Sequence, residues 1–168
     1  MEKQLLLLRH AKAEVAESGR PDLDRALAPR GVEDAYRIGR YLALQGLDPD
    51  LILCSTSLRT RQTEEQLRSA TALSAETLFL AELYLAPADE IVKVIRAFAT
   101  PQTRSLMVIG HNPGLEECVS RLTGEASLLS TGALAMIGLE TGDFAQLGQS
   151  GGILRGIVTA RSLPLTSD

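Results

Sequence analysis

Four consecutive leucines, Leu5–Leu8, lead directly into Arg9 and His10, and this stretch constrains the fold more than any other. A short continuous apolar run is typical of a strand that is buried on both faces of a parallel sheet. Open α/β sheets bind their ligands at the carboxyl ends of such strands. Arg9 is permanently charged and suits a phosphoryl group, and a neutral His10 is a nitrogen nucleophile. For such a dipeptide taken alone, a solvated turn is the commoner explanation. A functional role for Arg9 and His10 therefore has to be judged from the rest of the chain.

Strand and helix patterns alternate along most of the chain. Further apolar runs predict strands at 51–54, 77–80, 105–110, 133–139 and 153–158. Apolar residues at helical spacing predict helices over 32–45, from 58 to about 73, from about 87 to 98 and from 113 onward. We expect Ser57 and Asn112 to cap two of these helices, with Pro113 as a first helical residue. The alternation predicts a single α/β domain over residues 1–168, with a mostly parallel central sheet between two layers of helices. The last segment, 159–168, is expected at the surface.

Charge and cysteine content narrow the class of protein. The net charge is −4 and the pI is about 5.3, which argues against a broad nucleic-acid surface. No apolar run is long enough to span a membrane, and no secretion signal precedes the first strand. Cys54 and Cys118 are too few for a disulfide framework, so we expect a cytoplasmic protein. With two histidines and no C-x-x-C pair, we expect no metal site and no cofactor.

Two further polar motifs follow predicted strands. Ser57 as a helix cap places Arg59 in the first turn, where the helix dipole disfavours a cation. An arginine there is favourable if it shares an anion with the free backbone N–H groups. His111 and Asn112 follow the strand at 105–110 in the same way. Because the carboxyl ends of parallel strands lie at one edge of a sheet, we expect one crevice to gather these motifs with the Arg-His pair.

Two arginines and two histidines around one crevice suit the binding and transfer of a phosphoryl group. Arg9 and Arg59 would hold the phosphoryl oxygens and stabilise the charge that develops during transfer. His10 would attack phosphorus and form a phosphohistidine, which water then hydrolyses. The guanidinium groups supply the positive charge, so this reading needs no metal. Arg25, in the polar loop 15–31, is a weaker candidate for the same anion, and an exposed loop charge explains it somewhat better.

These motifs resemble those of the histidine phosphatase superfamily, which has the phosphoglycerate-mutase-like fold. The matching stretches are Leu8–Ala11, Ser57–Thr63 and Gly110–Gly114, and 27–31 and 131–134 also fit the pattern of its small SixA-type members. Within the superfamily the chain is most similar to the small SixA-type phosphohistidine phosphatases. The resemblance implies that His10 is the nucleophile and that the phosphoryl group is bound by Arg9, Arg59 and His111. For the carboxylic general acid of larger members Glu82 is the best candidate, although an exposed turn glutamate explains it equally well.

The resemblance implies a phosphatase that removes phosphate from phosphohistidine in a protein substrate. The lack of long insertions over the crevice favours a site that is open enough for a protein side chain. A phosphatase for a small phosphorylated metabolite remains an alternative, as does a module that recognises phosphorylated proteins without turnover.

Two other nucleophile patterns fit the chain less well. The stretch 148–152 has the G-x-S-x-G pattern of a nucleophile elbow, but it precedes a strand instead of joining a strand to a helix. A Cys-x5-Arg phosphatase loop that begins at Cys54 needs an arginine at position 60, but the chain has Thr60 there.

Overall fold

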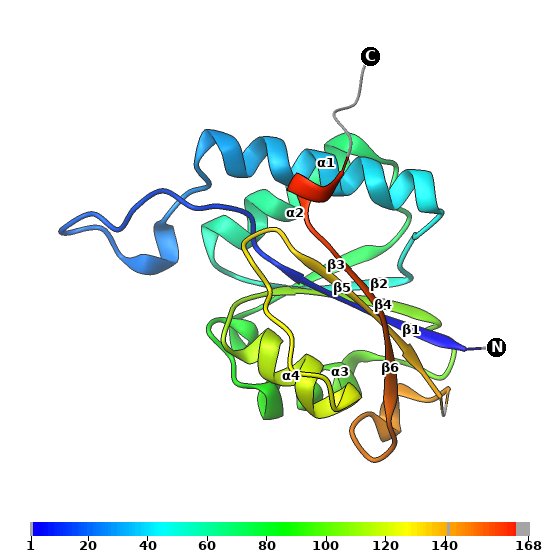
Figure 1. The fold of residues 1–168 in the computed structure, drawn as a ribbon. Coiled ribbons are helices and arrows are strands. Elements are labelled where there is room, and N and C mark those ends of the chain that lie inside the picture. The colour runs from blue at the N-terminus through cyan, green and yellow to red at the C-terminus, as the bar shows by residue number, and fades with distance from the viewer. Residues whose placement is uncertain (1, 141, 164–168) are drawn as a thin grey trace.

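The computed structural model describes residues 2–140 and 142–163 and has one six-stranded sheet between two layers of helices (Figure 1). The sheet order is β3-β2-β4-β1-β5-β6. The first four strands are parallel to one another, and β5 pairs antiparallel to both β1 and β6. The strands are β1 (Lys3–Arg9), β2 (Leu51–Ser55), β3 (Glu76–Leu80), β4 (Ser105–Gly110), β5 (Leu134–Leu139) and β6 (Gly152–Val158). The predicted three-layer α/β fold with a mostly parallel sheet is confirmed.

The alternating leucines of β1 explain why helices cover both faces of the sheet. Leu5 and Leu7 pack into one apolar layer with α3 (Ala88–Phe98) and α4 (Gly114–Thr123). Leu6 and Leu8 point the opposite way and pack against α1 (Pro29–Gln45) and α2 (Leu58–Ala70). All four leucines are fully buried, as the continuous apolar run predicts for a central parallel strand. Such a strand fixes the residues that follow it at the edge of the sheet.

The carboxyl ends of β1, β2, β3 and β4 all lie at the same edge of the sheet, because these four strands are parallel. The polar motifs therefore meet there. β6 runs in the direction of β1, and its first residue, Gly152, pairs with Leu139, which in turn pairs with Lys3 at the opposite edge. The G-x-S-x-G pattern thus precedes a strand and lies away from the Arg-His pair.

Two helix starts differ from the sequence prediction. Helix α1 begins at Pro29, three residues earlier than expected, since Pro29 has a favourable first-turn conformation. Helix α4 begins at Gly114, so Pro113 precedes the helix and Asn112 does not cap it. The Asn112 side chain donates instead to the Glu116 carboxylate and to the backbone carbonyl of Leu129, at 2.8 Å each. Ser57, by contrast, caps α2 as predicted and accepts from the backbone N–H of Thr60.

Two glycines allow the segments around the site to approach closely. A Cβ atom at Gly31, in the first turn of α1, would lie 2.0 Å from the backbone oxygen of Lys12. A Cβ atom at Gly114 would lie 1.9 Å from the backbone oxygen of Ala86. Backbone atoms cannot move aside as a flexible side chain can, so only glycine fits these positions. The first glycine brings α1 against the segment after β1, and the second brings α4 against the segment after β3.

The remaining sequence predictions concern the cysteines, the membrane and the chain end. Cys54 and Cys118 are both free and fully buried. No helix of the described residues is long and apolar enough to cross a membrane. Within those residues no group of three or more His, Cys, Asp or Glu side chains is arranged to hold a metal ion. In the final segment, Ala160–Ser162 forms a short 3-10 helix beside α1 (Figure 1), and 164–168 lie outside the described residues.

Candidate active site

His10 is held directly after β1 by the backbone on both sides of it. Its N–H donates to the carbonyl of Gly110 at the end of β4, with a nitrogen-to-oxygen distance of 3.1 Å. The next residue, Ala11, donates its N–H to the Thr63 hydroxyl of α2 at 3.0 Å. The ring Nδ1 lies 2.7 Å from the Ala11 carbonyl, which can only accept, so Nδ1 carries the proton. The other nitrogen, Nε2, therefore keeps its lone pair.

The His10 ring is neutral at physiological pH. Burial lowers its pKa to about 4, and the positive charges of Arg59, Arg9 and Arg25 act in the same direction. The hydrogen bond to Ala11 opposes this shift but does not reverse it. Only 6% of the His10 surface is exposed, so water does little to stabilise an imidazolium there. An unprotonated imidazole with a free Nε2 is the form in which histidine acts as a nucleophile.

Arg59 lies in the first turn of α2, next to the cap formed by Ser57, and is 2% exposed. The sequence predicts an anion beside Arg59, and in the structure that anion is the Asp22 carboxylate of the protein itself. Its Nη1 donates to the backbone carbonyl of Asp22 at 2.8 Å, and its Nη2 donates to the Asp22 carboxylate at 3.0 Å. The same Nη2 is 3.4 Å from Nδ1 of His111. Burial in this position agrees with a binding role and not with a solvated helix face.

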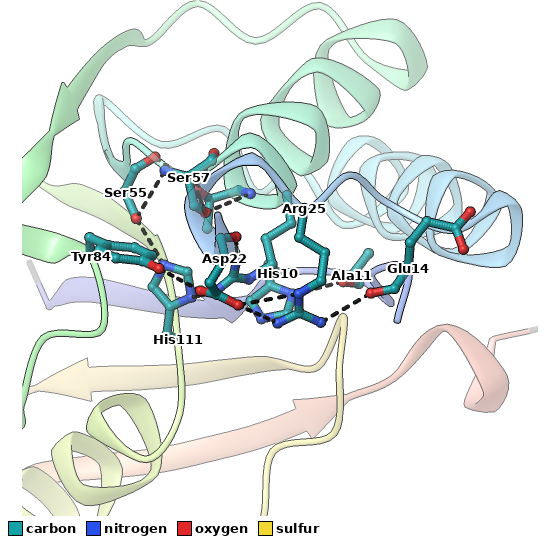
Figure 2. A network of polar contacts seen from close by, with 11 residues as sticks. His10, Ala11, Glu14, Asp22, Arg25, Ser55, Ser57, Tyr84 and His111 are labelled. Atoms are coloured by element: carbon teal, nitrogen blue, oxygen red, sulfur yellow. Dashed lines mark hydrogen bonds and ion pairs between the residues drawn. The ribbon is translucent and has the colours of Figure 1, made fainter. Parts of the chain in front are cut away.

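His111 directly follows β4, and its ring lies close to that of His10. Its ring centroid is 5.3 Å from that of His10, and its Nε2 is 2.8 Å from the hydroxyl oxygen of Ser55 (Figure 2). A guanidinium cannot accept a hydrogen bond, so the contact with Arg59 requires an unprotonated Nδ1 and a proton on Nε2. Burial and the nearby His10 and Arg59 lower the pKa of His111 to about 3. His111 is therefore also neutral at physiological pH.

Arg9 is held at the base of the site by backbone contacts. Its Nη1 donates to the Leu129 carbonyl at 3.0 Å, while its buried Nε has no hydrogen-bond partner among the described residues. Burial lowers the pKa of Arg9, and the Glu116 carboxylate partly offsets this effect. Asn112 connects the same elements, because it donates to both Glu116 and Leu129. The other terminal nitrogen of Arg9, Nη2, makes no hydrogen bond to the described residues and is left for a further anionic group.

The loop between β1 and α1 places Asp22 against the other site residues (Figure 2). The Asp22 carboxylate accepts from the hydroxyl of Tyr84, from Arg25 at 3.0 Å and from Arg59. Arg25 also donates to the backbone carbonyl of Glu14 at 3.2 Å. Arg25 is thus tied to a loop carboxylate, and its charge also contributes to the low pKa of His10.

The structure does not bring Glu82 into this cluster. It is exposed on the short 3-10 helix Ala81–Leu83, and no hydrogen bond joins it to the described residues of the site. Tyr84, two residues later, faces the site instead, with its ring edge-on to His111 at 5.4 Å between centroids. The exposed-turn explanation of Glu82 therefore agrees better with the geometry than a role as general acid.

Sequence reasoning missed three residues of the site. Ser55 ends β2 at the same sheet edge as the other motifs, so its position was a usable signal. Tyr84 and Asp22 gave none, because each reaches the site through a loop whose course is set by tertiary packing.

Cys54, the rival nucleophile, lies beneath the site in the apolar layer, where burial raises the pKa of its thiol. A thiol of this kind is inert and not reactive.

Comparison with known proteins gives the class to which this fold and site belong. The model of the histidine phosphatase superfamily (branch 1) matches residues 5–83, and the chain belongs to this superfamily. A candidate phosphohistidine phosphatase, SixA from Nakamurella multipartitia, superimposes with a TM-score of 0.84 at 29% identity and covers 94% of this chain and 96% of that one.

Two uncharacterized proteins are related in sequence. One from the chloroplast of Arabidopsis thaliana is 31% identical over 143 residues, which make up 80% of this chain and 66% of that protein. One from Mycobacterium leprae is 33% identical over 124 residues, or 71% of this chain and 73% of that protein. The chain thus spans about two thirds to three quarters of the length of these relatives.

Proposed function

We propose that this chain is a metal-independent phosphatase that acts through a phosphohistidine intermediate at His10 and removes phosphate from phosphohistidine in a protein substrate. The observation that carries the proposal is the state of the His10 ring. The Ala11 carbonyl holds the proton on Nδ1, which leaves Nε2 free. The low pKa keeps Nε2 unprotonated at neutral pH. A ring held in this way, between guanidinium groups, is suited to attack phosphorus.

In the first step, the lone pair of His10 Nε2 forms a bond to phosphorus while the bond from phosphorus to the substrate nitrogen breaks. The other ring nitrogen of the substrate histidine takes a proton from solvent, so the ring keeps that electron pair and leaves as neutral imidazole. In the second step, a water oxygen bonds to phosphorus, the pair of the N–P bond returns to Nε2, and the water proton leaves with phosphate or solvent. Arg9 and Arg59 hold the phosphoryl oxygens throughout.

His111 would bind the phosphoryl group after a change of tautomer that Ser55 makes possible. While Nδ1 faces Arg59, Nε2–H donates to the Ser55 hydroxyl. A hydroxyl can also donate, so Ser55 can reverse this hydrogen bond and leave Nδ1 protonated. Nδ1–H can then donate to a phosphoryl oxygen that Arg59 also binds. The ring would act as a neutral donor and need not become an imidazolium.

The choice of phosphohistidine as substrate draws support from the SixA structures. Two candidate phosphohistidine phosphatases of this type share 29% of their sequence with this chain and superimpose over nearly its whole length. The site agrees with this choice because it offers no buried carboxylic acid at Glu82. An alkoxide leaving group needs a strong proton donor, whereas imidazole leaves as a weakly basic neutral molecule.

The test is a substrate panel with trapping of the intermediate. A phosphohistidine-bearing protein, phosphoserine, sugar phosphates and para-nitrophenyl phosphate are compared in the presence of a chelator. We expect turnover of the phosphohistidine protein to exceed that of the others, and rapid quenching to yield an acid-labile, alkali-stable phosphate adduct that His10→Ala lacks. Preference for a sugar phosphate would favour a metabolite phosphatase. Phosphate binding without any turnover would favour a recognition module.

A further inference from the structure

Asp22 occupies the position of an anion within the candidate site. Its Oδ2 accepts from the Tyr84 hydroxyl and from Nη2 of Arg59, and its Oδ1 accepts from Nη2 and Nε of Arg25 at 3.0 and 3.3 Å. Figure 2 shows this carboxylate between the Arg25 guanidinium and the Tyr84 and His111 rings. Three donors from three segments of the chain thus converge on one carboxylate group.

Asp22 occupies the Nη1–Nη2 edge of the Arg59 guanidinium, where a phosphoryl group could bind through two oxygens. A guanidinium binds two oxygens through either Nη1 with Nη2 or Nε with Nη2, and Nη2 has one N–H group for each arrangement. In Arg59, Nη2 donates to the Asp22 carboxylate and contacts His111, and Nη1 donates to the Asp22 carbonyl. Two-point binding of a phosphoryl group at the Nη1–Nη2 edge of Arg59 therefore requires that Asp22 leave this edge. Nε, at the other edge, is buried and has no hydrogen-bond partner among the described residues.

We propose that Asp22 is a specificity-determining residue of the phosphoryl site, a built-in carboxylate that an incoming phosphoryl group displaces from Arg59. The inference rests on the proposed phosphatase function. Arg59 is 2% exposed in the first turn of α2, whereas the Asp22 side chain is 44% exposed on a loop. The aspartate and not the arginine is therefore the partner that moves.

The charge of Asp22 determines which ligands can displace it. The Tyr84 hydroxyl, Arg25 and Arg59 hold the pKa of Asp22 at about 2, so the carboxylate is ionised at neutral pH. A dianionic phosphoryl group has more charge and more acceptor oxygens than a carboxylate, and it gains Arg9 and His111 as additional partners. A carboxylate ligand offers Arg59 nothing that Asp22 does not already provide. Asp22 thus selects for phosphoryl groups over the abundant monoanions.

The chain contains a matched control for this carboxylate. Asp24 lies on the same short 3-10 helix, Asp22–Asp24, and is exposed. Its side chain has no hydrogen bond or ion pair to the described residues, unlike that of Asp22. Asp24→Asn removes the same charge from the same loop without touching Arg59. The two variants therefore separate direct competition from a general electrostatic effect on anions.

The experiment measures the binding of inorganic phosphate by calorimetry to the full chain. We expect Asp22→Asn to bind phosphate about three- to tenfold more tightly than the wild type, because an ion pair with one half-exposed partner contributes modestly and its loss leaves Arg59 free to bind phosphate. Asp24→Asn should change the affinity by less than about twofold. Unchanged or weaker binding by Asp22→Asn overturns the inference, and so does an equal gain in Asp24→Asn.

A second measurement shows whether the competition passes through Arg59. In an Arg59→Lys background, the gain from Asp22→Asn should be largely lost, because a single ammonium cannot form the fork that Asp22 blocks. A full gain in that background contradicts the inference. If the wild type forms phospho-His10 but Asp22→Asn gains no affinity, the inference alone fails. If the wild type neither binds phosphate nor turns over any phosphorylated substrate, the proposed function fails with it.

Discussion

His10 and His111 follow neighbouring parallel strands in the same register, yet the structure holds their rings in opposite ways. Arg9 pairs with Gly110, so each histidine is the first residue beyond its strand. Both rings are almost fully buried, and both have a lowered pKa. His10 uses Nδ1 to donate to a backbone carbonyl, whereas His111 uses Nε2 to contact a serine hydroxyl.

Because both rings are buried, the different roles of the two histidines follow from their hydrogen-bond partners and not from burial. A carbonyl accepts only, so the tautomer of His10 is fixed and Nε2 remains a nucleophile. A serine hydroxyl both donates and accepts, so His111 can change its tautomer and serve as a binding group. The comparison predicts one indispensable ring and one supporting ring.

The largest expected effect separates the two rings directly. His10→Ala should lower kcat/KM about 10⁴-fold or more, because the nucleophile is lost. His111→Ala should lower it about 10²-fold, the loss typical of one preorganised donor, and should still form phospho-His10. Single-turnover trapping with labelled phosphate measures both. Equal losses in the two variants, with no adduct in either, would break the comparison.

The next effect tests the guanidinium that contacts His111. Arg59→Ala should lower kcat/KM about 10²- to 10³-fold, and Arg59→Lys should recover only part of it, because an ammonium lacks the planar fork. Arg61→Ala is the matched control from the same helix. Arg61 is exposed and stacks over Phe79 at 4.4 Å, so its loss should leave kcat/KM within about twofold of the wild type. A comparable loss at Arg61 would point to a helix-wide effect and not to binding by Arg59.

The sequence predicted the site residues that follow buried strands and missed those that loops deliver. Apolar runs fix where a parallel strand ends, so the positions of Arg9, His10 and His111 could be read from the chain. The cap at Ser57 placed Arg59 in the first turn of α2 in the same way. Local patterns of this kind are sufficient where the site residue lies within a turn of a regular element.

Asp22 reaches Arg59 across 37 residues of sequence, and no local pattern encodes that contact. The loop that carries it is positioned by packing, including the close approach that Gly31 permits. The start of α4 was mispredicted for a similar reason. Asn112 is a common capping residue, but its side chain finds partners in Glu116 and in the distant Leu129. Tertiary partners of this kind override a local preference.

A pH titration of stability tests whether both rings are neutral in the fold. The folded pKa values of about 4 for His10 and about 3 for His111 lie below the value near 6.5 of an unfolded histidine. The unfolded state therefore binds more protons in this window, and the free energy of unfolding falls as the pH falls from 7 to 5. Each ring should contribute about 2 kcal/mol to this loss. Urea unfolding at both pH values should show a smaller loss in His111→Asn, and an undiminished loss would contradict a neutral His111.

Ser55 gives a smaller effect that acts on one ring only. Ser55→Ala removes the hydroxyl that stabilises either tautomer of His111, and we expect kcat/KM to fall about tenfold, as for the loss of one buried hydrogen bond. The phospho-His10 adduct should still form. Nitrogen chemical shifts of His111 in the phosphate complex should show a protonated Nδ1 in the wild type and a mixture of tautomers in the variant. Unaltered shifts would mean that Ser55 does not control the His111 tautomer.

The smallest expected effect concerns Cys54, the alternative nucleophile. Cys54 is fully buried one residue before Ser55, its thiol donates weakly to the Ser55 carbonyl at 3.4 Å, and burial raises its pKa. Cys54→Ser preserves the shape and a donor, so kcat/KM should stay within about twofold, with a modest loss of stability from placing a hydroxyl in an apolar layer. Cys118→Ser, in the opposite layer, is the control for that packing cost, and paired activity and thermal unfolding measurements separate the two effects. An inactive but folded Cys54→Ser, together with an active His10→Ala, would transfer the nucleophile from nitrogen to sulfur.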